Sequence, residues 1–264
     1  MRALFHTILF IAISIVSFTS TAHAALETNI LITVKARDAK FIGSEAGGAF
    51  VTIRNRLTGE IIADGMTYGT TGDTDLLMAD SIARDAVLVT EDSAFFQFSL
   101  DFWEPIPVTI TATGPMGQTQ STVSVSEDML LLPGKDYTSG NGIMLELPGF
   151  AVDVVSPLPN AKYEFNPDIP VTLEANVMKM CGCKIEPGTP WSPERYLVEV
   201  HIYKASFYIT SFTVPYSGEP GIYTHNLKLP KPGTYKMVVT AFDQKTKEAG
   251  MDTTTVILTK PEQQ

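Results

Sequence analysis

Apolar and polar residues alternate with a period of two along most of this chain, and this pattern constrains the fold more than any other feature. Residues 30–36 (ILITVKA) and 49–54 (AFVTIR) are two examples, and a turn at residues 57–60 follows the second. Successive side chains of a β-strand point to opposite faces, so the alternation predicts strands with one buried face. No apolar period of 3.6 residues persists beyond about two helical turns. The sequence therefore predicts an all-β protein.

The alternation breaks twice near the middle of the chain. Pro and Gly interrupt it at 133–142 and again at 148–149, where a new alternating segment starts. These breaks predict two tandem β-sandwich domains, 25–149 and 150–260, with at most one short helical turn, within 76–89. The predicted strands are 30–36, 49–54, 61–63, 94–100, 108–112, 120–125, 143–147, 150–155, 171–177, 195–204, 207–214, 222–229, 235–242 and 252–258.

The first 24 residues have the features of a cleaved signal peptide. Arg2 precedes an apolar run at 8–18, and small residues, Ala22 and Ala24, occupy the positions that a signal peptidase inspects. Eleven helical residues span roughly 16 Å, about half of a bilayer core, which makes an uncleaved anchor the weaker alternative. We therefore expect a periplasmic or secreted protein with no membrane span in its mature chain, and a disordered tail at 261–264.

The chain is acidic. Its formal net charge is −10, and removal of residues 1–24 takes away only Arg2, which leaves −11. A phosphate backbone would repel such a chain, so nucleic acid is not expected as a partner. The chain has two cysteines. Its stability must therefore come mainly from apolar cores rather than from a disulfide framework.

Two local motifs resemble known sandwich families. Residues 231–241 (KPGTYKMVVTA) resemble the start of a strand in immunoglobulin-like and fibronectin-like domains, a resemblance that implies that Tyr235 hydrogen-bonds back to the preceding corner. In the first half, Thr58-Gly59-Glu60 followed by Gly65 resembles transthyretin-like and carboxypeptidase-regulatory-like sandwiches. In general character the chain also resembles bacterial exported proteins. These resemblances imply a fold and no activity.

Sulfur side chains are concentrated in residues 177–184 (VMKMCGCK). Cys181 and Cys183 are spaced to close a disulfide across Gly182, whose backbone freedom permits the tight turn. A three-residue loop makes a weak staple, worth about 1.6 kcal/mol on chain-entropy grounds. Free thiols without a further role, and a labile redox pair, remain alternatives.

The same segment offers four soft donors for copper: Met178, Met180, Cys181 and Cys183. Strand parity predicts that the two methionines point outward, while the proline-rich loop 184–194 that carries Trp191 covers the site. Antiparallel pairing of 171–180 with 222–229 would bring His225 near Met178, although its parity directs the ring inward. A structural histidine is the alternative for His225, and dimer contact is the alternative for the methionines.

Other chemistry is sparse. Asp73, Asp75 and Asp80 gather in one polar loop, but their spacing matches no calcium-binding loop, and we expect a solvated turn. None of the common catalytic or phosphate-binding motifs occurs. The sequence therefore predicts an exported, non-catalytic binding or accessory protein that works with another exported or cell-envelope protein. The alternatives are a thiol-disulfide redox-active protein or a subunit of a cell-surface or periplasmic assembly, and an enzyme with cross-strand carboxylates or a metal centre.

Overall fold

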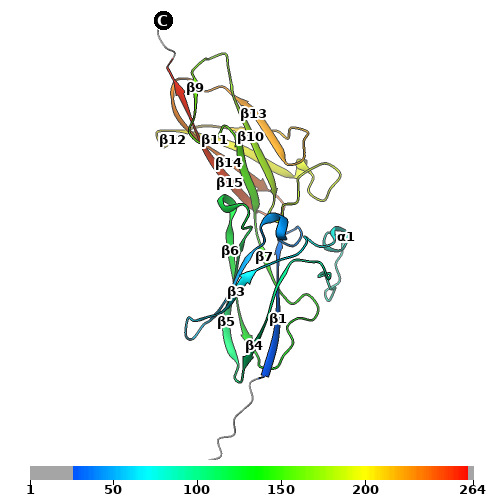
Figure 1. Cartoon of the computed structure of the whole chain (residues 1–264). Helices are drawn as coiled ribbons and strands as arrows, with labels where there is room; N and C mark the ends of the chain where they lie inside the picture. Colours follow the sequence, from blue (N-terminus) through cyan, green and yellow to red (C-terminus); the bar gives the residue numbers. More distant parts are fainter. Residues whose placement is uncertain (1–25, 261–264) are drawn as a thin grey trace, which may run out of the picture.

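A computed structural model describes residues 26–260 and shows an elongated all-β molecule, which confirms the predicted fold class (Figure 1). The predicted signal peptide, 1–24, and the predicted tail, 261–264, lie outside the described residues. No described helix is long and apolar enough to cross a membrane.

The first half of the chain forms a sandwich of two sheets. One sheet has the order β4-β1-β7, with β1 antiparallel to β4 and parallel to β7, and the other has the order β3-β2-β5-β6. The buried face of β1 meets those of β2 and β5 in the core. The strands are β1 Leu26–Ala36, β2 Phe50–Asn55, β3 Ile61–Met66, β4 Phe95–Phe102, β5 Ile106–Gly114, β6 Val123–Leu131 and β7 Ile143–Leu147.

The second half forms another sandwich, in which three strands face five. The orders are β13-β10-β8 and β12-β11-β14-β15-β9, and neighbours are antiparallel except β15 and β9. The predicted antiparallel pairing of the strand beginning at Val171 with the strand beginning at Ile222 is confirmed. The strands are β8 Phe150–Ser156, β9 Ala161–Glu164, β10 Val171–Lys179, β11 Tyr196–Lys204, β12 Phe207–Thr213, β13 Ile222–Leu227, β14 Gly233–Asp243 and β15 Ala249–Thr259.

Tyr235 forms the corner that the sequence motif implied. Its ring is fully buried at the start of β14, and its hydroxyl donates a hydrogen bond to the Lys231 carbonyl oxygen at 2.8 Å. The Lys204 ammonium lies 4.8 Å from the ring centroid. The tyrosine thus fixes the connection between β13 and β14 to the core, as in immunoglobulin-like sandwiches.

Two sequence expectations were wrong in detail. The predicted strand 120–125 is a 3₁₀ turn, Thr119–Ser121, followed by β6. The Ser121 hydroxyl bonds both the N–H and the carbonyl of Val152, and this contact with the second sandwich holds the turn out of the sheet. Strand β9 was missed because it is only four residues long and pairs with β15 alone.

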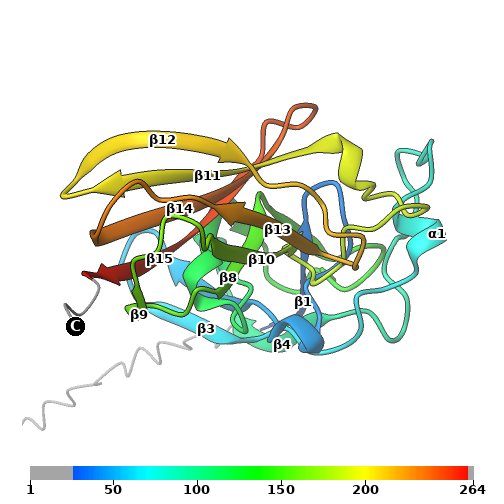
Figure 2. The same ribbon diagram turned by 90° about the horizontal axis from the view of Figure 1, so that it is seen from above.

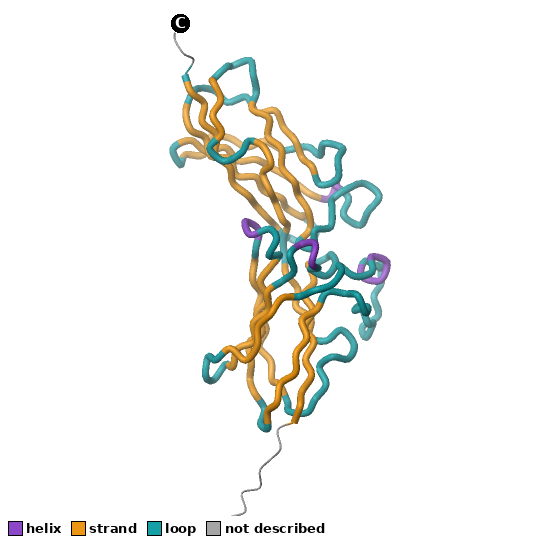
Figure 3. The backbone as a smooth tube through the Cα atoms, viewed as in Figure 1, coloured by secondary structure: helices purple, strands orange, loops and turns teal. Residues whose placement is uncertain are grey.

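The two sandwiches meet end to end, and short helical turns lie near their junction (Figure 3). Buried apolar residues from both halves belong to one continuous cluster. The polypeptide passes from β7 to β8 through Pro148 and Gly149. Among the described residues no strand of one half pairs with a strand of the other, so side chains and turns make the junction.

Candidate functional site

The sulfur-rich segment forms a tight turn at the end of β10. Cys181 and Cys183 are joined by a disulfide, with their Cα atoms 5.4 Å apart. Gly182 has φ +79°, a left-handed conformation that glycine adopts without strain. The Lys179 N–H donates to the Cys183 carbonyl at 3.0 Å, and the Gly182 N–H donates to the Lys179 carbonyl at 2.8 Å. The turn is therefore closed by covalent and backbone bonds together.

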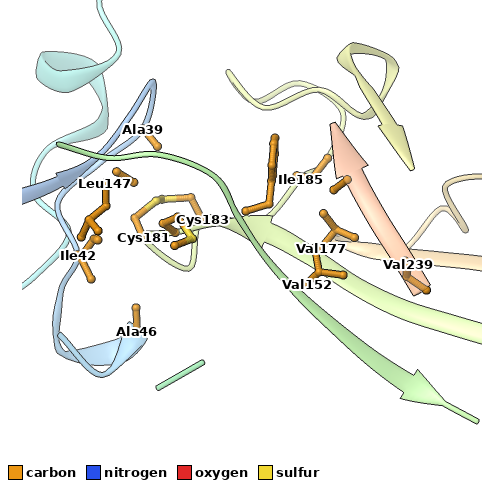
Figure 4. Close-up of a cluster of buried hydrophobic side chains, with 14 of the residues drawn as sticks. Ala39, Ile42, Ala46, Leu147, Val152, Val177, Cys181, Cys183, Ile185 and Val239 are labelled. Atoms are coloured by element: carbon orange, nitrogen blue, oxygen red, sulfur yellow. A yellow bond between two sulfur atoms is a disulfide. The ribbon is translucent and has the colours of Figure 1, made fainter. Parts of the chain in front are cut away.

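This disulfide packs in the junction between the sandwiches. Figure 4 shows it with Ile42, Ala46 and Leu147 of the first half on one side and Val177 and Ile185 of the second half on the other. Only 1% of Cys181 and 9% of Cys183 is exposed. The disulfide is thus a packing element of the junction.

A cleft of about 410 Å³ opens beside the disulfide turn. It brings together four of the five predicted site residues, Met178, Met180, Cys181 and Cys183, with Trp191 from the predicted covering loop. The first half contributes Lys40, Glu45, Ala46, Thr71, Pro115, Gly117 and Gln118, and the second half also contributes Ala151 and Gly182.

The predicted outward position of Met180 was wrong, because 1% of the residue is exposed. Strand β10 ends at Lys179, so the alternation no longer applies to the next residue. Met178 remains on the partly exposed face, as expected.

His225 does not belong to this cleft. It pairs with Leu173 on β10, five residues from Met178 and roughly 17 Å along the strand. Its ring stacks on Phe212 with centroids 5.5 Å apart. The predicted proximity to Met178 was therefore wrong.

A buried ion pair that sequence reasoning missed lies at the base of the disulfide turn. The Lys179 ammonium contacts the Glu248 carboxylate at 2.7 Å and lies 4.6 Å from the Phe150 ring centroid. The sequence did hold a signal of this ion pair. Lys179 lies on the same face of β10 as the core residues Val171, Leu173, Ala175 and Val177. A charged residue at a core position predicts a buried partner.

Charged groups also join the sandwiches directly. Arg195 bridges Asp38 of the first half and Asp243 of the second. The Trp191 indole N–H donates to the Asp38 carbonyl oxygen at 3.0 Å, and only 5% of Trp191 is exposed. Trp191 therefore docks its loop onto the first sandwich.

Asp243 carries a shifted pKa in this network. Burial by itself would raise the pKa of Asp243, but hydrogen bonds from Arg195, the Lys245 N–H and the Thr246 hydroxyl lower it to about 2. Burial likewise opposes the charge of Arg195, yet its hydrogen bonds to the two aspartates raise the pKa of its guanidinium. Both groups are therefore charged at neutral pH.

The chemistry available to the cleft depends on the state of the cysteines. A disulfide supplies no thiolate, so Met178 and Met180 are the remaining soft donors of the predicted copper site. Within residues 26–260, no three His, Cys, Asp or Glu residues cluster as a metal site. Copper binding stays a prediction, and it requires reduction first.

The acidic loop has a structural role at one position. The Asp73 carboxylate accepts a hydrogen bond from the Leu76 N–H at 3.0 Å and thereby caps α1, Thr74–Leu77. This short helix overlaps the helical turn predicted within 76–89 only at Leu76 and Leu77, and it begins in the stretch that was expected to be a polar loop.

The end of the second sandwich far from the junction, called here the distal end, has a different character. It comprises residues 162–170, 203–209, 228–236 and 258–260, which β-pairing holds together and which Figure 2 shows at one end of the molecule. Large apolar side chains are exposed here, including Phe207 (75%) and Ile169 (68%). A notch of about 280 Å³ lies between the sheets, lined by Tyr163, Phe165, Ile169, Leu229 and Leu258 among others.

Comparisons with known proteins find similarity to some solved structures. No protein-family model matches it, and no curated protein matches it. The similar solved structures include an engineered protein (17% identity, 46% of this chain, TM-score 0.31), of which this chain spans only 23%. They also include fibronectin(III)-like modules of Clostridium thermocellum CbhA (11% identity, 92% and 96% of the two chains, TM-score 0.28). A DUF3823 family protein from Bacteroides uniformis is similar over 89% of this chain and 100% of its own (11% identity, TM-score 0.27).

Proposed function

We propose that this chain is an exported, non-catalytic binding or accessory protein and that the distal end of the second sandwich is its binding surface. The observation that carries the proposal is the exposure of large apolar side chains on the turns of this end. Phe207 and Tyr208 are 75% and 56% exposed on the edge strand β12, and Ile169 is 68% exposed at the apolar notch near β9, the other edge of the same sheet. Large exposed apolar side chains at one end of a molecule, together with an apolar notch, indicate an interaction surface.

The hairpin that joins β11 to β12 presents the aromatic part of this surface. Ala205 and Ser206 both have positive φ, which fits a two-residue turn of the kind that tight hairpins use. Tyr208 packs edge-on against Tyr203, with ring centroids 5.7 Å apart. The hairpin is thus a supported projection from the sheet.

Two features of the chain support the exported and non-catalytic parts of the proposal. A disulfide suits an oxidising compartment outside the cytoplasm. The cleft at the junction has its cysteines closed in that disulfide, and its charged groups Lys40 and Glu45 have no histidine beside them. This supports a structural role for the cleft and leaves the distal end as the surface for a partner.

Site-specific cross-linking tests the proposal. A photo-reactive residue is placed at position 207 or 169 of the full chain, which is then expressed in its native host and irradiated. Position 68 is the matched control, because Tyr68 is also aromatic and 69% exposed but lies in the first sandwich. We expect adducts at 207 and 169 and none at 68. Equal labelling at the three positions, or none at 207 and 169, would overturn the proposal.

A further inference from the structure

We propose that the partner of the distal end is an anionic lipid surface, which the chain contacts with lysine ammonium groups and exposed apolar side chains together. This inference rests on the proposed function and names the partner of that surface. It is carried by the distribution of charge over the molecule.

The two sandwiches differ strongly in charge. Residues 26–149 hold 7 Lys and Arg against 17 Asp and Glu, a net charge of −10, whereas residues 150–260 hold 11 of each sign. Within the second sandwich the distal end is basic, because it contains six lysines against Glu164 and Asp168. The lysines are Lys162, Lys204, Lys228, Lys231, Lys236 and Lys260. An elongated molecule with this distribution turns its distal end toward an anionic surface.

Most of these lysines are free to meet a partner. Five of the six are exposed, and no ion pair between described residues involves any of the six. Lys204 is only partly exposed, because its ammonium donates to the Pro232 carbonyl oxygen at 2.7 Å and lies over the Tyr235 ring. Each free lysine near an anionic lipid surface contributes about 1 kcal/mol, or roughly a fivefold gain in binding.

The apolar side chains lie among these lysines. Register pairing places Lys204 opposite Tyr235 and Gly233 opposite Leu258, so the hairpin with Phe207 and the notch with Ile169 occupy the same end. These side chains project from separate turns and do not form one continuous flat face. A bilayer accepts such scattered groups at the level of its headgroups, whereas a protein partner would need a complementary shape.

The opposite end of the molecule also exposes large apolar side chains, but its charge differs from that of the distal end. Leu57 and Trp103 are 81% and 68% exposed there. Asp101 and Glu104 flank Trp103 in the sequence, so an anionic surface would repel that end. Exposed apolar groups therefore occur at both ends. The opposite end also has one exposed lysine, Lys135, but there Asp101, Glu104 and Asp136 outnumber it, whereas lysines outnumber acidic residues at the distal end.

Vesicle co-sedimentation of the purified full chain tests this inference. Vesicles of phosphatidylcholine alone are compared with vesicles that also contain phosphatidylglycerol. We expect binding to the anionic vesicles only, and release when the ionic strength is raised to about 1 M, where the Debye length falls to roughly 3 Å. The double variant Lys228→Gln with Lys231→Gln should weaken binding roughly 25-fold.

Matched variants keep the outcome interpretable. Lys184→Gln with Lys245→Gln removes the same charge from exposed positions near the junction and should leave binding within about twofold of the parent. Ile169→Ser should weaken binding, and Tyr68→Ser should not. Equal loss in both lysine pairs, or equal binding to both kinds of vesicle, would overturn the inference.

The failure of this inference can be distinguished from failure of the proposed function. Protein adducts at positions 207 and 169 without vesicle binding would overturn the lipid partner and leave the binding surface in place. Absence of both adducts and vesicle binding would overturn both.

Discussion

Lys179 and Glu248 form an ion pair that is sealed from solvent: Nζ lies 2.7 Å from Oε2, and the two side chains are 0% and 1% exposed. The pair joins the last residue of β10 to the residue before β15, at the base of the disulfide turn. The Thr246 hydroxyl lies 3.1 Å from Oε2 and 2.9 Å from Asp243 Oδ2, so its one proton is shared between these two carboxylates. Because no water reaches the pair, each charge depends on the other for its solvation.

Removal of one partner should therefore be costly. We expect Lys179→Met to lower the free energy of unfolding by roughly 3–5 kcal/mol, because Glu248 then stays buried without a counter-charge. The double variant Lys179→Met with Glu248→Gln should recover most of this loss. Urea denaturation of the three proteins measures the difference. A single variant that loses less than about 1 kcal/mol would show that water reaches the pair.

Asp243 should make the protein sensitive to acid. Its pKa of about 2 in the folded chain lies below its ordinary value of 3.8, so its stabilising contribution is complete above about pH 4 and is lost as the pH falls through 2. The shift corresponds to about 2 kcal/mol. We expect Asp243→Asn to lower the free energy of unfolding by about that amount at pH 7 and to flatten its decline between pH 4 and pH 2. Chemical denaturation across this range checks both effects, and an unchanged acid slope would contradict them.

The strands of this protein could be predicted from the sequence because their signal is local. Most strands follow from the alternation, and Tyr235 follows from a motif of four residues. Strand β9 and the turn at Ser121 were not predictable in this way, since each exists because of a partner distant in the sequence. Local pattern carries no record of such partners.

The candidate sites also differ in whether their residues are close together in the sequence. The sulfur residues are neighbours in the sequence, so their grouping could be predicted. The place of His225 depends on the strand register, which the sequence does not supply. The six lysines of the distal end come from separate turns spread over about a hundred residues, from 162 to 260. No sequence window contains them together, and only the fold shows the surface that they form.

The corner at Tyr235 should be a measurable source of stability. Tyr235→Phe keeps the buried ring and removes only the hydroxyl that donates to the Lys231 carbonyl. We expect a loss of about 1 kcal/mol in the free energy of unfolding, the usual net value of one hydrogen bond. Tyr68→Phe serves as the control, because Tyr68 is 69% exposed and should lose nothing measurable. Equal losses in the two variants would show that the corner does not matter.

The cysteine turn supports a last prediction, about copper and oxidation state. The oxidised protein should contain no free thiol and should bind Cu(I) weakly, because its disulfide offers no thiolate and only Met178 and Met180 remain as soft donors. Reduction by a dithiol breaks the S–S bond, forms two thiols and leaves the dithiol as its own disulfide. The reduced protein should then bind Cu(I) tightly, and Cys181→Ser should not. Competition against a chromophoric Cu(I) chelator, before and after reduction, measures this. Equal Cu(I) binding by the oxidised and reduced forms, or full binding by Cys181→Ser, would contradict a copper site at this turn.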